Sequence, residues 1–329
     1  MSVDHEVRIP PPRAHLAGTL ALLERFEALA GGNPHAAALR RFLDRPEALP
    51  EAVPKQDNTL KYDAYIARGP AQLAWGVAVG DRYEGAAMRA PLAALLAALP
   101  GDYRMDAALA LGADLDGAAP SLTVAAGFDH PQRPPRMKLY FQEDRWGAGV
   151  ASAGALREAL AVHAPGCALP DWVPAERPVG VLTPELLPDG ALGVKAYLGG
   201  ASPQEAAEGA PPEAQALAAA MAARCPLTPG YYYLTLRMRP GTPHRYAINK
   251  IYDHVRLGFT RDAAELPAAW AELAELFAFA GRAAHLAALQ GLLGQLQGVR
   301  VVPTASALED GGQSADLYCA AWAMPPRAG

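Results

Sequence analysis

The chain repeats one sequence pattern five times, and this repetition limits the possible folds more than any other feature. Each repeat contains two extended runs joined by a short turn, such as Pro188-Asp189-Gly190. We therefore expect five antiparallel hairpins. Their strands are expected at 59–67 and 72–79, 122–128 and 136–142, 179–187 and 192–198, 231–239 and 246–255, and 300–308 and 315–324.

Segments rich in Ala and Leu separate the hairpins and are predicted to be helical. Before the first hairpin, Leu16, Leu20 and Phe26 follow helical spacing, so one or two helices are expected within 14–44. Pro91 is placed at the first position of the next helix, where proline is tolerated. The later helices are expected at 91–99, 153–163, 213–224 and 264–297.

Antiparallel hairpins that alternate with helices are typical of the α+β class. Ten strands without evident edge protection favour closure into a barrel, because closure removes the edges. We expect a ten-stranded antiparallel β-barrel made of five repeated hairpins, surrounded by an outer ring of α-helices. With 329 residues, the chain is expected to form a single barrel domain, 1–329, on which an N-terminal helical segment, 1–56, packs.

Three of the five lysines occur in the tripeptide Lys-x-Tyr, 57 and 55 residues apart. Each falls in the second strand of an expected hairpin. The other 24 of the 29 basic residues are arginines, so a lysine kept at a repeated position suggests that a compact cation is needed there. The three tripeptides are Lys138-Leu139-Tyr140, Lys195-Ala196-Tyr197 and Lys250-Ile251-Tyr252.

Alternation along these strands predicts a polar barrel interior. Met137 and Leu139 share one strand face, which the helices would cover, whereas Arg136 and Lys138 share the other face with Tyr140. The same alternation is also typical of a sheet whose polar face lies in water. The matched spacing of three motifs favours the interior position.

If the polar faces point inward, Lys138, Lys195 and Lys250 converge, and Arg136 adds a fourth cation. Few carboxylates are expected on these strand faces, so the cations would lack partners, and unpaired buried charges are costly. An anionic ligand would remove that cost. A diphosphate offers several charges and many acceptor oxygens, and it is the ligand we expect.

Aromatic residues accompany the cations on the same faces. Tyr140, Tyr197 and Tyr252 each follow a lysine by two residues, and Tyr318 holds the equivalent place in the fifth hairpin. Aromatic rings stabilise a carbocation through their π faces and keep water from reaching it. Cations beside aromatic rings therefore predict ionisation of an allylic diphosphate, with the four tyrosines as the cation shield.

Composition and charge limit the classes of partner and the cellular location that we expect. The net charge of −5 and the pI of about 5.9 argue against nucleic-acid binding, which needs a basic face. The three cysteines make neither a metal-ligand spacing nor a disulfide framework, so a cytoplasmic location is expected. No signal peptide and no apolar run long enough to span a membrane are visible.

The five-fold plan and three strand motifs resemble the ABBA-type aromatic prenyltransferases, the group of the dimethylallyltryptophan synthases and the peptide-modifying cyanobactin prenyltransferases. The resemblance covers about 57–324. Length and short hairpins make the chain more similar to the compact peptide-modifying members. The motifs are Arg136-Met137-Lys138-Leu139-Tyr140-Phe141, Val194-Lys195-Ala196-Tyr197-Leu198 and Asn249-Lys250-Ile251-Tyr252.

The resemblance implies the function and partners. A dimethylallyl or geranyl group would pass from its diphosphate, through a shielded allylic cation, to an electron-rich acceptor: an indole, a phenol or a peptide side chain. It implies natural-product biosynthesis, with lysine and arginine on the diphosphate. No cofactor is obligatory, although Mg²⁺ is possible because some members use it. No metal ligands are predicted.

The chain departs from the family at two positions. The expected inward face of the second strand has no cation, so Lys61 or Arg237 is expected to replace the family's arginine there. The first strand offers Asp63 instead of the usual glutamate as catalytic base, and a surface ion pair of Asp63 with Lys61 is equally expected. Trp322 is expected either to line the acceptor site or to pack in the core. These departures leave open an alternative, a non-catalytic barrel that binds an anionic small molecule.

Overall fold

The structure is a computed structural model that describes residues 12–43, 62–68, 73–83, 85–115, 121–142, 149–252 and 265–323. The predictions for Lys61, and for the side chains of Asp63 and Trp322, lie outside what is described.

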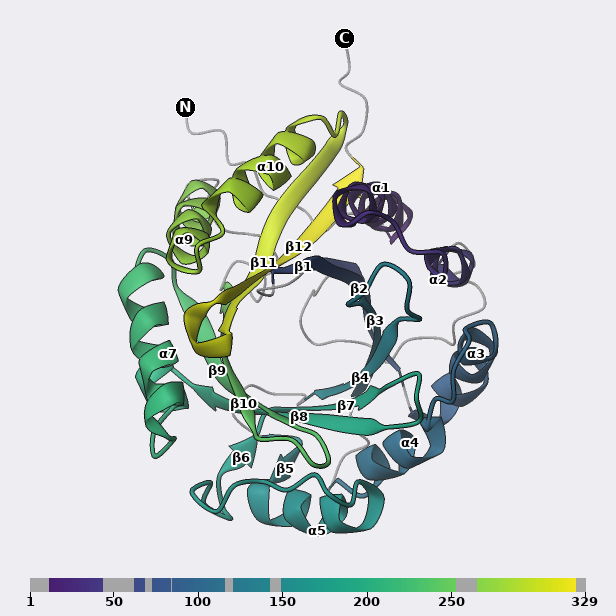
Figure 1. Ribbon diagram of the computed structural model, residues 1–329, viewed down its shortest axis with the longest axis vertical. Helices are drawn as coiled ribbons and strands as arrows, with labels where there is room; N and C mark the ends of the chain where they lie inside the picture. Colours follow the sequence, from purple (N-terminus) through teal and green to yellow (C-terminus); the bar gives the residue numbers. More distant parts are fainter. Residues whose placement is uncertain are drawn as a thin grey trace.

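Ten strands form a closed barrel, seen end-on in Figure 1. All pairings are antiparallel, and the ring runs in the order β1-β12-β11-β10-β9-β8-β7-β4-β3-β2. The antiparallel sheet with its covering of helices is therefore confirmed. The barrel strands are β1 (Tyr62–Arg68), β2 (Leu73–Tyr83), β3 (Ser121–Phe128), β4 (Arg136–Gln142), β7 (Val181–Leu186), β8 (Leu192–Gly200), β9 (Gly230–Met238), β10 (Arg245–Tyr252), β11 (Val299–Glu309) and β12 (Ser314–Ala323).

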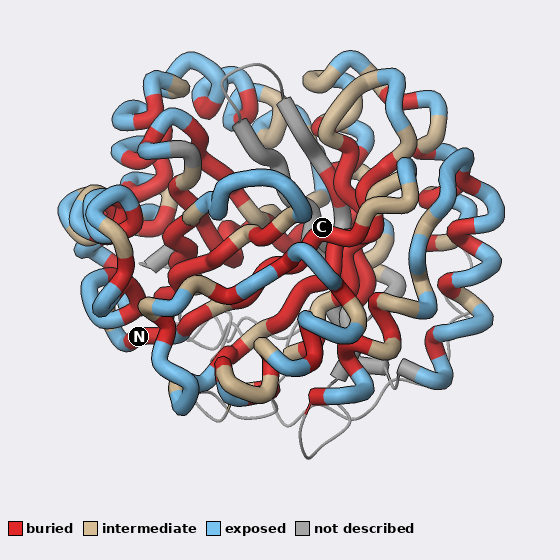
Figure 2. Tube along the Cα trace, turned by 60° about the horizontal axis from the view of Figure 1, so that its bottom comes forward, coloured by how far each residue is buried: buried red, intermediate tan, exposed pale blue. Residues whose placement is uncertain are grey.

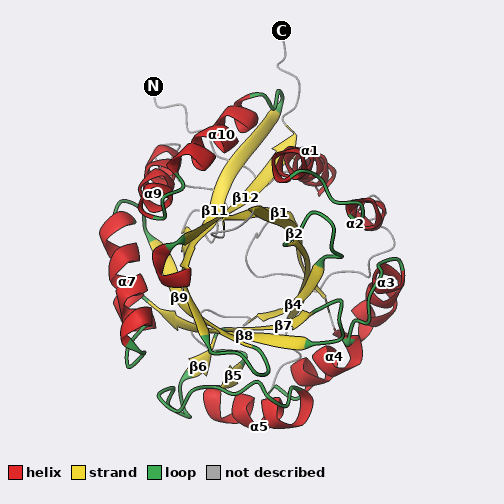
Figure 3. Ribbon diagram, viewed as in Figure 1, coloured by secondary structure: helices red, strands yellow, loops and turns green. Residues whose placement is uncertain are grey.

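Helices surround the barrel on its outside, as Figure 3 shows. Two of them were not expected, α4 and the single turn α6. Pro91 lies inside α3 and not at its start, because the helix begins six residues earlier. The helices are α1 (Pro12–Ala30), α2 (Ala36–Leu43), α3 (Gly85–Ala97), α4 (Met105–Ala113), α5 (Ala153–His163), α6 (Pro203–Ala206), α7 (Pro212–Arg224), α9 (Glu265–Phe279) and α10 (Ala283–Gly294).

Three details complete the outer layer. A glycine with a left-handed backbone, Gly281, separates α9 from α10, which the sequence had suggested as one helical region. A small two-stranded sheet, β5 (Ala151–Ser152) with β6 (Pro178–Val179), lies outside the barrel beside α5. A 3₁₀ turn, η2 (Asp310–Gly312), joins β11 to β12.

The hydrophobic core lies between the outer face of the barrel and the helices. Met137, Leu139 and Phe141 on β4 are buried there. The ring of Phe141 lies so close to Gly112 on α4 that a side chain at that position would overlap it. In Figure 2 the barrel strands are largely buried, while the helices carry exposed stretches. The apolar face of β4 therefore points outward and its polar face inward.

Helix α1 of the N-terminal segment contacts β12, β1 and β2. It thus covers the place where the first and last strands of the barrel meet (Figure 1). None of the described helices is both long and apolar enough to cross a membrane.

Consecutive strands pair antiparallel around the ring, so the strand ends that lead into the described hairpin turns lie at one end of the barrel. Residues near a hairpin turn are therefore brought to the same end even when they are far apart in the sequence. Arg136 begins β4, Glu185 and Arg237 lie near the ends of β7 and β9, and Asp316 lies near the start of β12. This shared position assembles the site described next.

Candidate functional site

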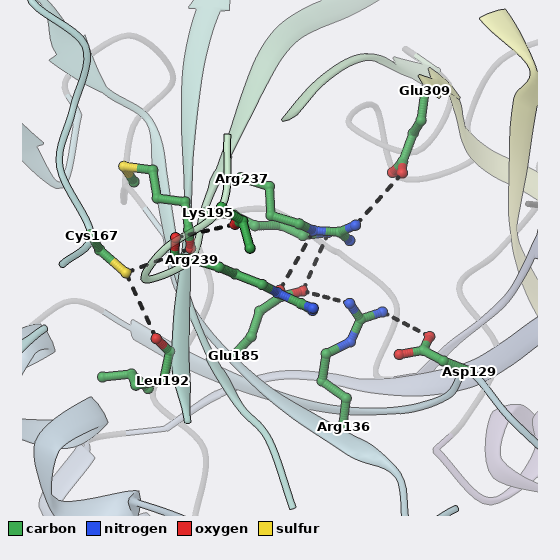
Figure 4. A network of polar contacts seen from close by, with 11 residues as sticks. Asp129, Arg136, Cys167, Glu185, Leu192, Lys195, Arg237, Arg239 and Glu309 are labelled. Atoms are coloured by element: carbon green, nitrogen blue, oxygen red, sulfur yellow. Dashed lines mark hydrogen bonds and ion pairs between the residues drawn. The ribbon is translucent and has the colours of Figure 1, made fainter. Parts of the chain in front are cut away.

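A cluster of charged side chains faces the barrel interior from β4, β7, β8 and β9 (Figure 4). Lys138 lies opposite Glu185 in the β4–β7 pairing, and Lys195 lies opposite Arg237 in the β8–β9 pairing. Arg136 is on the same face as Lys138, two residues earlier. The structure therefore brings together four of the predicted diphosphate-binding residues.

Glu185 lies at the centre of this cluster with no solvent exposure. Its Oε1 is 3.1 Å from Nη1 of Arg136 and 3.6 Å from Nζ of Lys195. Its Oε2 is 3.5 Å from Nε of Arg237 and 3.3 Å from Nη2 of Arg239, which directly follows β9. Burial by itself raises the pKa of Glu185, but the four cations outweigh it and hold that pKa well below its usual range.

The small residue opposite Glu185 makes room for this arrangement. Gly193 on β8 pairs with Glu185, and a Cβ there would stand 3.2 Å from Cγ of Arg239 and 3.5 Å from Oε2 of Glu185. Outward from the cluster, Nη2 of Arg136 donates to Asp129 at 2.8 Å, and Nη1 of Arg237 is 3.9 Å from Glu309. The cluster thus reaches across several strands.

The cations outnumber the carboxylates around them, and the pKa values of the two interior lysines are lowered. Burial lowers the pKa of Lys138 well below its usual value, and the charges of Arg136 and Lys195 lower it further. Burial and the charge of Arg237 lower the pKa of Lys195 to about 8. The buried Nε of Arg239 has no hydrogen-bond partner among the described residues. The interior therefore holds surplus donors and positive charge that an anion would satisfy.

The lowered pKa of Lys195 predicts a pH dependence. Lys195 is charged below about pH 8 and neutral above it, so affinity for inorganic diphosphate should fall as the pH rises through 8, by up to about tenfold per pH unit. In the variant Lys195→Arg the guanidinium stays charged, and its affinity should change much less between pH 7 and 9. Titration calorimetry on both proteins measures the difference, because the ionisation of diphosphate itself is common to the two. Parallel pH profiles would show that Lys195 does not contact the anion.

Tyrosines lie beside the cations on the interior faces. The rings of Tyr140 and Tyr197 are 6.4 Å apart between centroids, and Tyr197 meets Tyr233 edge-on at 5.9 Å. Tyr318 lies two residues after Asp316 on the same face of β12, and its pKa is raised by burial first and then by Asp316, Tyr140 and Tyr197. Tyr233 was missed because it stands in a run of three tyrosines, in which alternation alone does not identify the inward ring.

Two further carboxylates face the interior, Glu309 on β11, which lies 3.9 Å from Arg237, and Asp316 on β12. The lysine-bearing strands β4 and β8 carry no carboxylate, as expected, but Glu185 and Glu309 on other strands pair with the cations, so the expectation that the cations lack partners is wrong. Glu185, Glu309 and Asp316 all lie within a few residues of a hairpin turn. In the sequence they are indistinguishable from the polar residues that usually flank turns, and only their inward alternation with Leu186, Leu308 and Leu317 hints at their position.

Lys250 and Tyr252 do not join this site, contrary to expectation. Lys250 has no solvent exposure, and its Nζ donates to the carbonyls of Cys225 and Thr228 at 2.8 Å and to Glu272 on α9 at 2.8 and 3.0 Å. Because α9 lies outside the barrel, this face of β10 points outward, and Tyr252, two residues on, is buried in the same layer. The interior position belongs to Asn249, whose amide donates to Thr235.

The register also places the two acceptor-site candidates. Asp63 on β1 pairs with Ala78, and Trp322 on β12 pairs with Arg300. Their side chains lie outside the described residues, so their predicted roles stay predictions. Within the described part of the chain, no group of three or more His, Cys, Asp or Glu residues is arranged to hold a metal ion.

The closed barrel and its helical ring match the fold of the ABBA-type aromatic prenyltransferases, and comparison with solved structures shows this fold over nearly the whole chain. AnaPT from Neosartorya fischeri superposes with a TM-score of 0.64 at 12% identity, covering 97% of both chains. The 6-dimethylallyltryptophan synthase from Micromonospora olivasterospora, solved with DMASPP and Trp, gives a TM-score of 0.63 at 17% identity over 95% of this chain and 98% of that one.

A third structure, the binary complex of PriB with product diphosphate, gives a TM-score of 0.60 at 18% identity over 96% of this chain and 99% of that one. No protein-family model and no curated protein sequence matches the chain. At these identities the comparisons establish the fold, and the activity must be argued from the residues.

Proposed function

We propose that the protein is a prenyltransferase that moves an allylic group from its diphosphate to an electron-rich aromatic acceptor. The observation that carries this proposal is the cluster of Arg136, Lys138, Lys195, Arg237 and Arg239, which faces the barrel interior with more positive charge than Glu185 compensates.

A diphosphate matches this cluster in charge and in geometry. Planar guanidinium groups bind two oxygens of a phosphate at once, and lysine ammonium groups bind as point charges. As the allylic C–O bond breaks, negative charge develops on the leaving diphosphate, and fixed cations stabilise that charge without reorganisation. The cluster would therefore both bind the donor and promote its ionisation.

The tyrosines next to the cluster would protect the allylic cation. Tyr140, Tyr197, Tyr233 and Tyr318 offer ring faces and edges around the same interior, and burial raises the pKa values of Tyr140, Tyr197 and Tyr318, so these phenols stay neutral. A neutral aromatic wall contributes roughly 0.5–2 kcal/mol per cation contact and limits access of water.

The structural neighbours support the choice of substrates. Two of them were solved with DMASPP and Trp, and PriB was solved with product diphosphate. We therefore propose a dimethylallyl or geranyl donor and an indole, a phenol or an aromatic peptide side chain as the acceptor. We also propose that residues 1–329 form one barrel domain. We propose that the protein works in the cytoplasm, which is supported by three buried cysteines that form no disulfide.

The test is acceptor-dependent turnover. The protein is incubated with dimethylallyl or geranyl diphosphate and with tryptophan, tyrosine or short aromatic peptides, and products are identified by mass spectrometry. We expect a mass gain of one prenyl group and release of diphosphate that requires both substrates. Lys195→Met and Arg237→Met should lose donor binding. Arg89→Met, which removes an exposed cation on α3, is the matched control and should behave like the parent.

Donor binding without product under all of these conditions would favour the alternative, a barrel that only binds an anionic small molecule. Turnover that survives in both interior variants would show that the donor site lies elsewhere.

A further inference from the structure

Asp316 stands on the wall of the barrel that faces the cation cluster. In the ring of ten strands, β12 is five strands away from β7 in either direction, so Asp316 and Glu185 lie on opposite walls. Both lie near the hairpin-turn end, Glu185 one residue before the end of β7 and Asp316 two residues after the start of β12. A molecule bound between these walls would have the diphosphate site on one side and Asp316 on the other.

The carboxylate of Asp316 has no polar or charged residue directly across from it in the adjoining strands. Its partners in the two neighbouring strands are alanines, Ala67 on β1 and Ala307 on β11. The residue is only 5% exposed, and among the described residues its Oδ1 has no hydrogen-bond partner. A buried carboxylate oxygen without a partner is costly and calls for a functional explanation.

The other two interior carboxylates, Glu185 and Glu309, are stabilised in their charged form by nearby cations. Glu185 is held by four cations, and the charge of Arg237 keeps the pKa of Glu309 below its usual value even though burial alone raises it. Carboxylates stabilised in their charged form are weak proton acceptors. Among the carboxylates described in the interior, Asp316 alone is biased toward holding a proton.

The charged groups around Asp316 explain this bias. Burial and the neighbouring charge of Glu309 raise the pKa of Asp316 to about 7, although Lys195, Lys138 and Arg237 across the interior lower it in part. Tyr318, two residues along the same strand, also faces it. A carboxylate that gains and loses a proton near neutral pH is suited to general base catalysis.

On the basis of the proposed prenyl transfer, we propose that Asp316 is the catalytic base that removes a proton from the acceptor. The allylic C–O bond of the donor breaks and diphosphate leaves with the electron pair. The acceptor forms a bond to the allylic carbon, its own C–H, N–H or O–H bond breaks, and the electrons of that bond return to the acceptor. The proton goes to Oδ1 of Asp316 and then to water.

The experiment compares Asp316→Asn with the parent in three assays. Binding of inorganic diphosphate should be no weaker, and hydrolysis of the donor without acceptor should stay within about threefold. Transfer to the acceptor should fall by about 10²–10⁴-fold, the scale of a lost general base. With a ring-deuterated acceptor, the variant should show a larger kinetic isotope effect than the parent, because proton removal becomes slow. A purely structural role would not produce this effect.

Two further measurements guard against misfolding and misassignment. Thermal melts should show the variant to be as stable as the parent at pH 4 and more stable at pH 8, because the parent must ionise a buried group there and the variant need not. In Asp316→Ala, added formate should restore part of the transfer rate. The variant Asp63→Asn, measured in the same transfer assay, tests Asp63, the catalytic base expected from the sequence.

The outcomes separate the two proposals. A parent that transfers, with an Asp316→Asn variant within threefold of it, would overturn the role of Asp316 alone, and loss of transfer only in Asp63→Asn would assign the base to β1. A parent that binds diphosphate but modifies no acceptor would overturn the proposed function and this inference with it.

Discussion

Replacing Lys250 with methionine is expected to lower the free energy of unfolding by about 3–5 kcal/mol, the usual cost of breaking a fully buried ion pair. Lys250 and Glu272 have no solvent exposure, so the variant would leave the carboxylate of Glu272 buried without its cation. The ammonium group also holds the carbonyls of Cys225 and Thr228, which would lose their donor. Urea unfolding followed by circular dichroism measures the loss.

The same variant should bind diphosphate like the parent, because Lys250 faces outward. The double variant Lys250→Met/Glu272→Gln should recover much of the lost stability, since it removes the unpaired charge while keeping an amide oxygen for the backbone of Leu227 and Thr228. Lys195→Met gives the opposite pattern, with weak binding and a stable fold. Weak diphosphate binding with unchanged stability in Lys250→Met would place Lys250 in the interior after all.

Glu185→Gln is expected to destabilise the free protein and to tighten its binding of diphosphate. The variant removes the buried charge that compensates Arg136, Lys195, Arg237 and Arg239, so the cations repel one another and unfolding becomes easier by about 3–5 kcal/mol. Diphosphate then supplies the missing charge. Its affinity should rise by at least tenfold, and the melting temperature should return toward that of the parent as diphosphate is added.

The pH range of this effect follows from the pKa of Glu185. The cations hold it well below the usual value, so the stability that Glu185 contributes is present above the ordinary glutamate pKa and is lost only as the pH falls through the lowered one. The gap between parent and variant should therefore persist from neutral pH into the acidic range. Glu309→Gln, at a more exposed position, is the control and should show a smaller loss. Equal stability with weaker diphosphate binding in Glu185→Gln would contradict the proposed role of the cluster.

Local patterns were sufficient for much of the fold. The bounds of α5 and β4 agree with those expected from the sequence, because turn residues, apolar spacing and β-propensity point to the same boundaries there. The extra helix α4 was missed, since its Ala- and Leu-rich stretch has apolar residues on all sides and little periodicity. Lys138 and Lys195 were assigned to the correct face because their strands alternate clearly between apolar and polar residues.

The site was harder to predict because its geometry depends on distant partners. Both faces of β10 carry polar residues, so the sequence pattern allows either Asn249 or Lys250 to face the barrel interior. A shift of one residue exchanges the two faces of a strand and reverses this assignment. Lys250 faces outward because it pairs with Glu272, which lies 22 residues away on a helix. The alternation of residues along β10 gives no sign of this partner. Glu185 and Asp316 are more than a hundred positions apart in the sequence and face the same interior only because the barrel closes.

The charges of the barrel interior are unevenly distributed. The side formed by β4, β7, β8 and β9 carries more cations than Glu185 compensates, whereas β11 and β12 contribute the carboxylates Glu309 and Asp316. Once a diphosphate covers the cations, negative groups lie on both sides of the space between. In the proposed reaction, a positive charge formed there would be stabilised by the negative groups around it, so the interior charges would already be arranged for a cation that exists only during the reaction.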